Sequence, residues 1–373
     1  MRVHVVDPPA YTPPYDRALC AALAAAGAEV ELVTSRFPYG DVPAAAGYEV
    51  REAFYRLGTG LAAGGRARRA ARLAQHVPDM LRYRRAAARE ADVAHFQWLT
   101  VQHLDGRLLP RRVPVVLTAH DVLPREPRPG QREAQRGLYE RVDAVVVHSE
   151  HGRGRLIEEA GVDPEKVRVI PHGPLDHLAR VPDPQPLPPE LAAVDKPVVL
   201  LFGLMRPYKG LDVAIDAWQG IADAELWIVG LARMWIEGLR EVAPPTVRFL
   251  EGYVPDAQVA AYFRRADLAI LPYREIDQSG VLYTALAFGT PLVLGAVGGF
   301  PEVAATGAAE LVPPGDAPAL RETVRRLLAD PAARGRLAAA GRAAAEGPYA
   351  WPAIARAHLD LYAALRESPR WAC

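Results

Sequence analysis

The sequence predicts an α/β protein with two Rossmann-like domains, each built on a parallel sheet that helices cover on both faces. Short, almost continuously apolar runs alternate with amphipathic stretches along the chain, which is typical of parallel sheets. A proline-rich stretch without periodicity, residues 173–197, interrupts the alternation and is expected to be a linker. The length of 373 residues is more than one core usually organises, so two domains are expected.

In the first half of the chain, the apolar runs have the length of buried strands. They cover residues 3–6, 30–34, 93–98, 115–120, 144–149 and 167–172. Amphipathic stretches such as 17–28 and 152–162 predict helices between them. We therefore expect an N-terminal domain over residues 1–172.

The second half repeats the scheme and predicts a C-terminal domain over residues 198–351. Its expected strands are 197–203, 225–230, 247–252, 268–273 and 291–296, and its expected helices are 210–219, 256–265, 281–289 and 317–329. No strand follows the helical stretch 352–368, so the segment 352–373 is expected to cross back to the first domain. Ligands of such sheets bind beyond the carboxyl ends of the strands, and we expect them in a cleft between the domains.

Composition and charge exclude several classes of protein. The formal net charge is zero, which argues against a protein dedicated to nucleic acid. Cys20 and Cys373 provide neither a metal-binding spacing nor a disulfide framework, which suits a reducing compartment. The chain starts directly on an apolar strand instead of a signal peptide, and no apolar run approaches the ~20 residues of a membrane span. We expect a cytoplasmic protein.

The stretch FGLMRPYKGLD, residues 202–212, follows a predicted strand directly. If a helix begins near Gly210, then Arg206 and Lys209 stand at its positively polarised N-terminus, where an anion is favoured and cations alone are not. A diphosphate would neutralise both charges. Each charge-assisted contact would contribute roughly 1.5–3 kcal/mol of stabilisation. A pair of solvated surface charges explains this segment equally well. The pattern is not a P-loop, because the lysine precedes its glycine and no GKS/T follows.

A second stretch, residues 274–302, combines a strand end, a small-residue turn at Ser279–Gly280 and a helix. Such a turn can offer backbone N–H groups and a helix dipole to phosphate oxygens, although a turn with an N-cap is the commoner explanation of a lone Ser-Gly pair. Glu275 and Asp277 precede the turn and could accept hydrogen bonds from sugar hydroxyls. Farther on, Gly298–Gly299 would permit a close approach of the backbone.

The ordered segments of the second half resemble the donor domain of retaining nucleotide-sugar glycosyltransferases with the GT-B fold, family 4 (glycosyl transferases group 1). The segments are VLLFGLMRPYKGLDVAIDAW, ELWIVG, VRFLEGYVPDAQVAAYFRRADLAILPYR and SGVLYTALAFGTPLVLGAVGGFPE. The resemblance covers about residues 198–305 well, and it is moderate over 90–173, where LTAHD and VRVIPHG are similar to segments of the family. It implies the GT-B fold, a nucleotide-diphosphate sugar as donor substrate and no other cofactor.

The resemblance also implies roles for individual residues. It places Arg206 and Lys209, beyond Gly203 at the strand end, on the donor diphosphate. The family's other donor-binding positions match Tyr253 and Val254 at the nucleotide base, and Ser279, Gly280 and Val281 at the distal phosphate. His120 matches a histidine beside the donor sugar. Considered alone, it would be a histidine at a strand end whose ring is hydrogen-bonded within the protein.

This sequence departs from the family at a pair of glutamates separated by seven residues. Alignment on ALAFGTP places the pair at Ile276 and Thr284, neither of which is acidic. Thr284 could still hydrogen-bond a ribose hydroxyl, as a weaker acceptor than a carboxylate. Glu275 or Asp277 could replace the first glutamate if the loop is shifted.

The resemblance implies a retaining transfer by front-face attack, in which the leaving phosphate takes the proton of the acceptor and no metal takes part. Arg206, Lys209 and the Ser279–Gly280 amides would stabilise the leaving nucleoside diphosphate. We assign His120 and Glu275, together with the two cations, to the reacting end of the site. No DxD-like metal site follows a predicted strand, and the acceptor remains open between a carbohydrate, a lipid-linked molecule and a small molecule.

Two features of the first domain have alternative explanations. The loop 7–16 lacks the paired glycines of the family, and its Tyr11 and Tyr15 either shape an acceptor pocket or simply pack. A proline-interrupted helical region carries a cluster of arginines, which is either a solvated face or a contact for anionic lipid headgroups at the inner face of the membrane. The cluster comprises Arg66, Arg68, Arg69, Arg72, Arg82, Arg84, Arg85 and Arg89.

Two other functions have the same architecture. A sugar-nucleotide epimerase would need acid and base residues around the sugar, and the RPYKG segment argues against it. A non-catalytic nucleotide-sugar-binding protein would tolerate the loss of the glutamate pair. Release of nucleoside diphosphate from the donor without acceptor would indicate an enzyme, and binding without release would indicate the binding protein.

Overall fold

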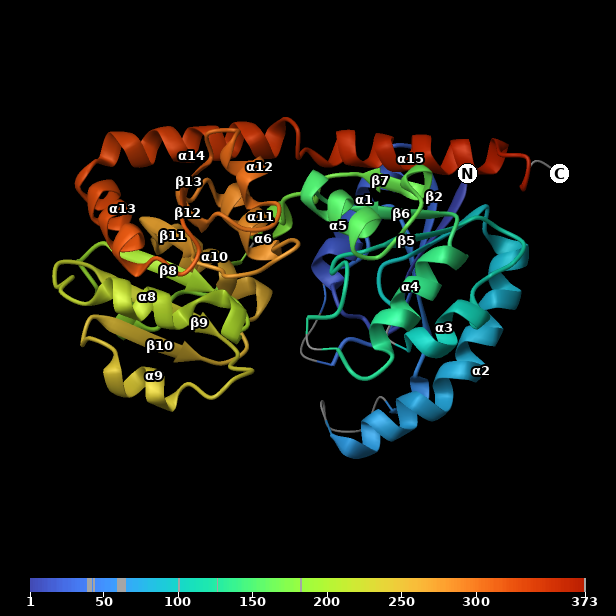
Figure 1. The fold of residues 1–373 in the computed structure, drawn as a ribbon, viewed down its shortest axis with the longest axis horizontal. Coiled ribbons are helices and arrows are strands. Elements are labelled where there is room, and N and C mark those ends of the chain that lie inside the picture. The colour runs from blue at the N-terminus through green and yellow to red at the C-terminus, as the bar shows by residue number, and fades with distance from the viewer. Residues whose placement is uncertain are drawn as a thin grey trace. The chain divides into compact units, whose positions relative to one another are not determined.

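The computed structural model describes residues 1–38, 42, 44–58, 65–99, 101–125, 127–181 and 183–371. The chain forms two compact units (Figure 1). The first combines Met1–Gly173 with Trp351–Cys373, and the second is Pro174–Ala350. Each unit is built on a parallel sheet between helices, so the predicted α/β class with two parallel sheets is confirmed.

The sheet of the first unit has seven strands in the order β3-β2-β1-β4-β5-β6-β7, and all neighbouring strands are parallel. The strands are β1 (Arg2–Asp7), β2 (Glu29–Ser35), β3 (Glu49–Phe54), β4 (Val93–Phe96), β5 (Val115–Thr118), β6 (Ala144–Val147) and β7 (Val167–Val169). The strands β4, β5 and β6 are buried throughout, which explains their continuous apolar sequences. The prediction missed β3 because this edge strand buries only Phe54 and therefore has no apolar run.

Six α-helices are described in the first unit. They are α1 (Pro13–Ala25), α2 (Arg66–Glu90), α3 (Gln102–Leu108), α4 (Gln131–Arg141), α5 (Glu150–Glu158) and α15 (Trp351–Glu367). The last of these belongs to the first unit although it follows the second in sequence. Ile354 and Tyr362 of α15 are buried in the same core as Leu19 of α1, and the Tyr362 hydroxyl lies 2.6 Å from Nδ1 of His95 on β4.

The sheet of the second unit has six strands in the order β10-β9-β8-β11-β12-β13, again all parallel. The strands are β8 (Val198–Phe202), β9 (Glu225–Gly230), β10 (Val247–Glu251), β11 (Leu268–Leu271), β12 (Leu292–Gly295) and β13 (Ala309–Val312). The larger helices are α8 (Leu211–Trp218), α9 (Glu237–Val242), α10 (Asp256–Arg265), α11 (Gly280–Phe288), α12 (Phe300–Ala304), α13 (Ala317–Ala329) and α14 (Pro331–Glu346). The prediction missed α14, which buries mainly small residues and so lacks a strong apolar stripe.

The stretch predicted as a linker, 173–197, is partly helical. All of it after Gly173 belongs to the second unit. It forms two short helices, α6 (Asp176–Ala179) and α7 (Pro189–Ala192), whose Leu178 and Leu191 are buried in the core of that unit. A few isolated leucines among prolines give no periodicity, which is why the sequence pattern indicated a linker.

The arginine cluster lies on α2, which runs through Pro78 instead of being interrupted there. Its arginines do not share one solvated face. Arg68 is buried, and the guanidinium of Arg72 donates to the carbonyl of Pro9 and to Oγ of Ser35, both at 3.3 Å. Within the described residues, no helix is long and apolar enough to cross a membrane.

Two loops at the carboxyl edge of the second sheet are tied together. The backbone N–H of Arg274, after β11, donates to the carbonyl of Tyr208, in the short 3₁₀ turn Pro207–Lys209, at 2.8 Å. The Arg274 guanidinium also forms a bidentate pair with Asp212 of α8. Gly210 between them has φ +68°, and a Cβ there would overlap the carbonyl oxygen of Pro272. This contact holds the loop after β8 against the loop after β11.

We predict that Gly210→Ala destabilises the protein by at least about 1–3 kcal/mol, because an alanine would be strained at this φ and would push the two loops apart. Urea unfolding measures the effect. The matched control is Gly335→Ala on the exposed side of α14, where a Cβ meets nothing within 4 Å. This control should raise stability by roughly 0.5–1 kcal/mol. Equal effects of the two substitutions would contradict the account.

Candidate active site

Lys209 is buried at the carboxyl edge of the second sheet, with only 6% of its surface exposed. Its ammonium lies 5.0 Å from the centre of the ring of Tyr273, a residue of the loop after β11. Gly203, directly after β8, has φ +104°, and a Cβ there would lie 3.0 Å from both the Lys209 ammonium and a methyl group of Val281. The fold therefore brings Gly203, Lys209 and Val281 together, as the sequence predicts for a donor site.

The first turn of α11 adds backbone donors to this place. Ser279 is its N-cap residue but makes no side-chain cap, and its hydroxyl lies 3.5 Å from that of Tyr273. Gly280 and Val281 are the first helical residues, so their backbone N–H groups have no partner within the helix. A helix N-terminus with free amides next to a buried cation suits an anion such as a phosphate.

Arg206 of the RPYKG segment takes no part in a structural ion pair among the described residues. No ion pair or side-chain hydrogen bond of its guanidinium is found within the described residues, and the side chain is partly exposed. The structural salt bridge of this region is made by Arg274 with Asp212 instead. This pair holds the pKa of Asp212 below its ordinary value, chiefly through the hydrogen bond from Arg274, against the opposing effect of burial.

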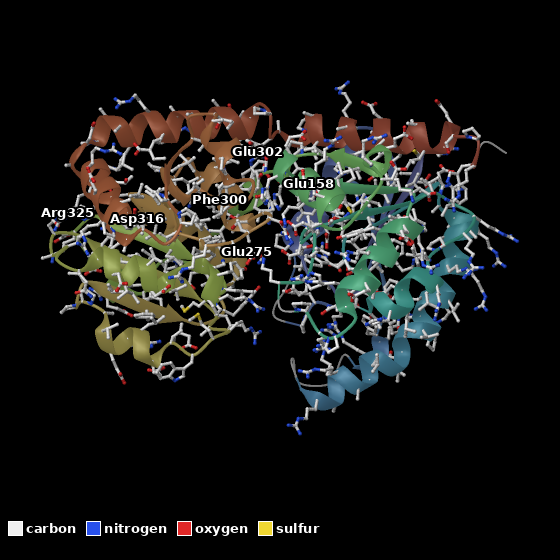
Figure 2. All side chains as sticks on the ribbon, in the orientation of Figure 1. Glu158, Glu275, Phe300, Glu302, Asp316 and Arg325 are labelled. Carbon is white, nitrogen blue, oxygen red and sulfur yellow. The ribbon has the colours of Figure 1, made fainter. Side chains whose placement is uncertain are left out.

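The remaining residues of the loop after β11 have different environments. Glu275, which is labelled in Figure 2, is exposed, whereas Asp277 is buried. Ile276, at the position of the family's first glutamate, is buried in the core. The hydroxyl of Thr284, at the second position, donates to the carbonyl of Gly280 at 2.9 Å, and the side chain is buried.

Tyr253 and Val254 lie on the loop between β10 and α10. Tyr253 is 46% exposed, and burial of the rest of the ring, with a smaller effect of Asp256, raises the pKa of its hydroxyl. Val254 packs against the core of the second unit. An exposed ring beside an apolar side chain offers a surface on which a nucleotide base can rest.

His120 follows β5 in the first unit and lines a cavity of about 180 Å³ at the carboxyl edge of that sheet. Trp98 stacks on its ring, with centroids 5.0 Å apart and planes at 14°, and Tyr15 of α1 approaches the ring edge-on at 5.0 Å. Tyr15 is thus a packing residue. Tyr11, in contrast, is exposed and touches Trp98, with the ring centroids at 4.6 Å.

The half-buried His120 belongs to a cluster of histidines. His148 and His172 follow β6 and β7, and the rings of both contact that of Tyr15. Burial, followed by the neighbouring His148, holds the pKa of His120 well below its ordinary value, so its ring is neutral near pH 7. Burial likewise lowers the pKa of His148 to about 4.

A buried pair of carboxyl groups, Asp7 and Asp16, lies at the end of β1 and in the first turn of α1. Asp7 accepts from the backbone N–H groups of Tyr11 and Thr12, and Asp16 accepts from the hydroxyl of Thr12. Burial and the neighbouring charge of Asp7 raise the pKa of Asp16 well above its ordinary value. The pair therefore retains a proton where isolated carboxyls would lose theirs.

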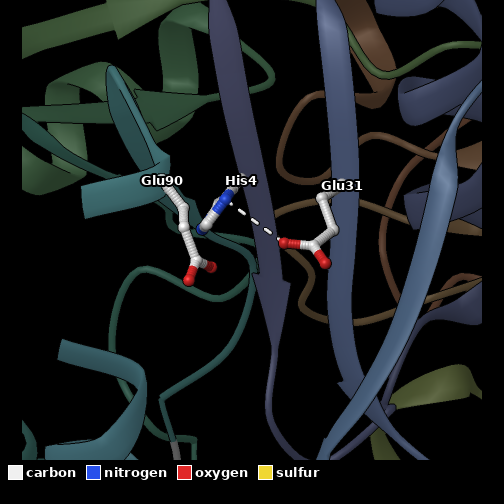
Figure 3. A group of neighbouring side chains, drawn as sticks. All are labelled: His4, Glu31 and Glu90. Carbon is white, nitrogen blue, oxygen red and sulfur yellow. Dashed lines mark ion pairs between the residues drawn. The ribbon is translucent and has the colours of Figure 1, made fainter. Parts of the chain in front are cut away.

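Within the described residues, one cluster has metal-ligand types close together: His4, Glu31 and Glu90 (Figure 3). His4 and Glu31 face each other in neighbouring strands, and Glu90 ends the helix before β4. Arg51 already bridges both carboxylates, at 2.5 Å and 2.9 Å. Its charge occupies the place of a metal ion, and the cluster is remote in sequence from the strand ends that carry the site residues.

The prediction missed Gln97, Trp98, His148 and His172 although all four lie within three residues after the ends of strands β4, β6 and β7. The same signal selected His120, so it could have selected them. The acidic pair Asp7–Asp16 had a weaker signal, because a carboxyl after a strand and another in a helix do not show in sequence that they meet.

Two parallel-sheet units of this kind define the GT-B class of fold. The structure is similar to sucrose-phosphate synthase from Thermosynechococcus elongatus, with a TM-score of 0.76 and 22% identity over 98% of this chain and 99% of that one. It is also similar to HepE from Anabaena in complex with UDP-glucose, with a TM-score of 0.73 and 19% identity over 98% of this chain and 100% of that one. At these identities the likeness shows the fold alone.

Residues 196–330 match the family Glycosyl transferases group 1, and residues 17–174 match Glycosyltransferase Family 4. D-inositol 3-phosphate glycosyltransferase from Segniliparus rotundus is 31% identical over 309 residues, which cover 75% of this chain and 68% of that protein. The chain therefore belongs to the family 4, group 1 glycosyltransferases, as the resemblance predicts.

Other relatives match over shorter stretches. Phosphatidyl-myo-inositol mannosyltransferase from Mycobacterium leprae is 33% identical over 243 residues, 62% of each chain. D-inositol 3-phosphate glycosyltransferase from Xylanimonas cellulosilytica is 29% identical over 248 residues, 59% of this chain and 57% of that protein. The chain thus spans less than two thirds of the length of these two relatives.

We predict that Asp16→Asn makes the stability of the protein less dependent on pH. Because the pKa of Asp16 is raised on folding, its stabilising contribution is fully present below the ordinary value of about 3.8 and is lost as pH rises through the raised value. Urea unfolding at pH 4.5 and pH 8 should show a smaller loss of stability for Asp16→Asn than for the wild type. The exposed Asp360→Asn is the matched control and should follow the wild type; parallel behaviour of all three proteins would refute the prediction.

Proposed function

We propose that the protein is a retaining glycosyltransferase that moves a sugar from a nucleotide-diphosphate donor to an acceptor. The observation that carries the proposal is the convergence of the buried Lys209 ammonium, Gly203 and the start of α11 at one edge of the second sheet. A buried cation and free helix amides provide preorganised positive potential where a diphosphate would gain charge as it leaves. Membership of the family supports the same role.

In the proposed reaction, the bond between the anomeric carbon and the diphosphate breaks as the acceptor oxygen attacks from the same face. The leaving phosphate takes the proton of the acceptor hydroxyl, so no separate base and no metal ion are required. Lys209 and Arg206 stabilise the leaving diphosphate, and the amides of Gly280 and Val281 hold its distal phosphate. Glu275 and Asp277 are proposed as the carboxylates that contact sugar hydroxyls, and His120 as a contact of the donor sugar.

The names of similar proteins give two donors to test first. A relative from Mycolicibacterium smegmatis is named as GDP-mannose-dependent, and HepE was solved with UDP-glucose. Thermal-shift measurements against the sugar nucleotides of UDP, GDP, ADP and dTDP would identify the base, because a ligand at saturation stabilises the folded protein by RT ln(1 + [L]/Kd). Absence of a shift with all of them would contradict the proposal.

We also propose a lipid-linked acceptor and a peripheral contact with the membrane. Relatives are named for phosphatidyl-myo-inositol and glycolipid acceptors. In this chain the exposed arginines of α2 lie in a segment with the exposed Leu57 (82%) and Leu73 (61%). Basic and apolar side chains together suit an anionic lipid surface. Equal binding to anionic and neutral liposomes at two salt concentrations would contradict this contact.

The non-catalytic binding protein and the epimerase are less well supported. Family membership favours a transferase over an epimerase. A binding protein would hold the donor without releasing nucleoside diphosphate, so slow release in the absence of acceptor separates the two.

We predict that Lys209→Met lowers the rate of nucleoside diphosphate release by ~10²–10³-fold, by analogy with the loss of an oxyanion donor. Methionine fills a similar volume without the charge, so the fold should be retained, and far-UV circular dichroism checks this. The matched control is Lys196→Met in the same unit, at the amino end of β8, which should leave the rate unchanged. Near wild-type release by Lys209→Met would remove Lys209 from the mechanism.

A further inference from the structure

We infer that His148 is a positioning residue that holds His120 in the tautomer with a bare Nε2. This nitrogen faces the cavity of the first unit, where it accepts a hydrogen bond from a hydroxyl group of the bound substrate. The assignment of that hydroxyl to a sugar or to the acceptor rests on the proposed function. The tautomer itself follows from hydrogen-bond donors and acceptors within the first unit.

The backbone carbonyl of Ile170 can accept a hydrogen bond but cannot donate one. Nδ1 of His148 lies 3.0 Å from this oxygen, so it must carry the hydrogen. His148 is buried and neutral, and a neutral imidazole has one N–H. Its Nε2 is therefore a bare acceptor.

That acceptor faces His120. The distance from Nε2 of His148 to Nδ1 of His120 is 3.2 Å. Two bare nitrogens at this distance would repel, so His120 carries its hydrogen on Nδ1 and donates it to His148. The hydrogen bond made by one ring nitrogen thus decides the state of the other.

The surroundings of His120 oppose a second proton on its ring. Its titratable neighbours are His148, His172 and His95, on strand ends or strands, and each disfavours another positive charge. Tyr15 of α1 presents a ring edge, and the nearby carboxylate of Asp121 pairs with Arg125 at 2.5 Å. A neutral His120 with its hydrogen on Nδ1 has a bare Nε2.

Gln97 can accommodate this tautomer. Its side chain is fully buried, its Oε1 lies 3.2 Å from Nε2 of His120, and its Nε2 has no hydrogen-bond partner within the described residues. With the amide placed in this way, Oε1 of Gln97 would face the bare Nε2 of His120, and two acceptors would oppose each other. A half-turn of the amide instead gives the unpartnered NH₂ group the bare nitrogen of His120 as its acceptor. In the ligand-free protein the amide then donates to the bare nitrogen, and a substrate hydroxyl takes its place at the single lone pair of Nε2 on binding.

The cavity beside this nitrogen suits a neutral, hydroxylated ring. Gln97 and His120 both line it, together with Trp98, Asp121 and three further glutamines, Gln102, Gln131 and Gln135. No lysine or arginine is among the described residues that line it. Amides and a carboxylate exchange hydrogen bonds with hydroxyl groups, whereas a phosphate would find no cation here.

The direct test is ¹⁵N NMR of the histidine rings in the ligand-free protein at pH 7. His120, assigned by loss of its signals in His120→Asn, should show a protonated Nδ1 and a bare Nε2. His148→Phe removes the acceptor and should shift His120 towards the form with hydrogen on Nε2. His148→Gln can still accept through its amide oxygen and should retain the wild-type tautomer. His172→Phe removes a neighbouring imidazole that makes no hydrogen bond to His120, and is the matched control.

The functional readout uses the sugar nucleotide that the thermal-shift screen identifies. His148→Phe should reduce kcat/KM for nucleoside diphosphate release at least tenfold, without changing the affinity for the free nucleoside diphosphate, and His148→Gln should restore most of the activity. A wild-type His120 protonated on Nε2, or a tautomer unchanged in His148→Phe, would overturn the inference. Failure to bind any sugar nucleotide would contradict the proposed function while leaving the tautomer to be judged by NMR.

Discussion

Burying a lysine ammonium costs free energy unless a neighbouring group balances its charge. The second unit is organised around such a buried ammonium. Lys209 lies under the carboxyl edge of the sheet, against the face of Tyr273, where the ring supplies part of the stabilisation. The same tyrosine hydroxyl approaches Ser279, the residue before α11. One aromatic side chain therefore connects the cation to the helix N-terminus. A phosphate at this place would be held by a charge, by free amides and by a dipole at once.

The loops that hold these groups are fixed by contacts that take no part in the proposed reaction. Arg274 joins the loop after β11 to the loop after β8 through Tyr208 and Asp212. Arg206 of the segment RPYKG makes no ion pair within the described residues. The salt bridge that fixes the two loops is formed by Arg274 instead. A partly exposed guanidinium that is not engaged can turn to a ligand without breaking a structural bond.

The first unit uses the same edge of its sheet in a different way. Its strand ends carry neutral, buried hydrogen-bonding groups where the second unit carries a cation. His120, His148 and His172 follow three neighbouring strands, and burial holds the pKa of each below its ordinary value. A set of neutral imidazoles can fix tautomers through a chain of hydrogen bonds without accumulating charge. Under the proposed function, the second unit would bind the anion and the first would bind hydroxyl groups.

Much of this could be predicted from the sequence, because parallel strands buried on both faces are continuous apolar runs. The strand 225–230 and the helices 256–265 and 317–329 have the predicted bounds. The resemblance implied that Gly203, Lys209 and Val281 belong to one site, and the fold brings these three residues close together. Edge strand β3 and the linker helices could not be predicted, since an element that buries one or two side chains leaves no periodic pattern.

Contacts made by single side chains were harder to predict. The hydroxyl of Thr284 donates to the carbonyl of Gly280 within its own helix, and the sequence pattern contains no trace of this choice. Likewise, the meeting of Asp7 with Asp16 depends on how the chain turns between β1 and α1. Pro78 lies inside α2 because tertiary packing of the helix outweighs the loss of one backbone hydrogen bond.

The most direct test of the central claim, that Lys209 and Arg206 grip a diphosphate, is calorimetric titration with matched nucleoside mono- and diphosphates. The wild type should prefer the diphosphate of its own base over the monophosphate. Lys209→Met and Arg206→Gln should each reduce that preference by roughly 10- to 100-fold, as expected for the loss of one charge-assisted contact. A preference that survives in both variants would show that the two cations do not hold the pyrophosphate.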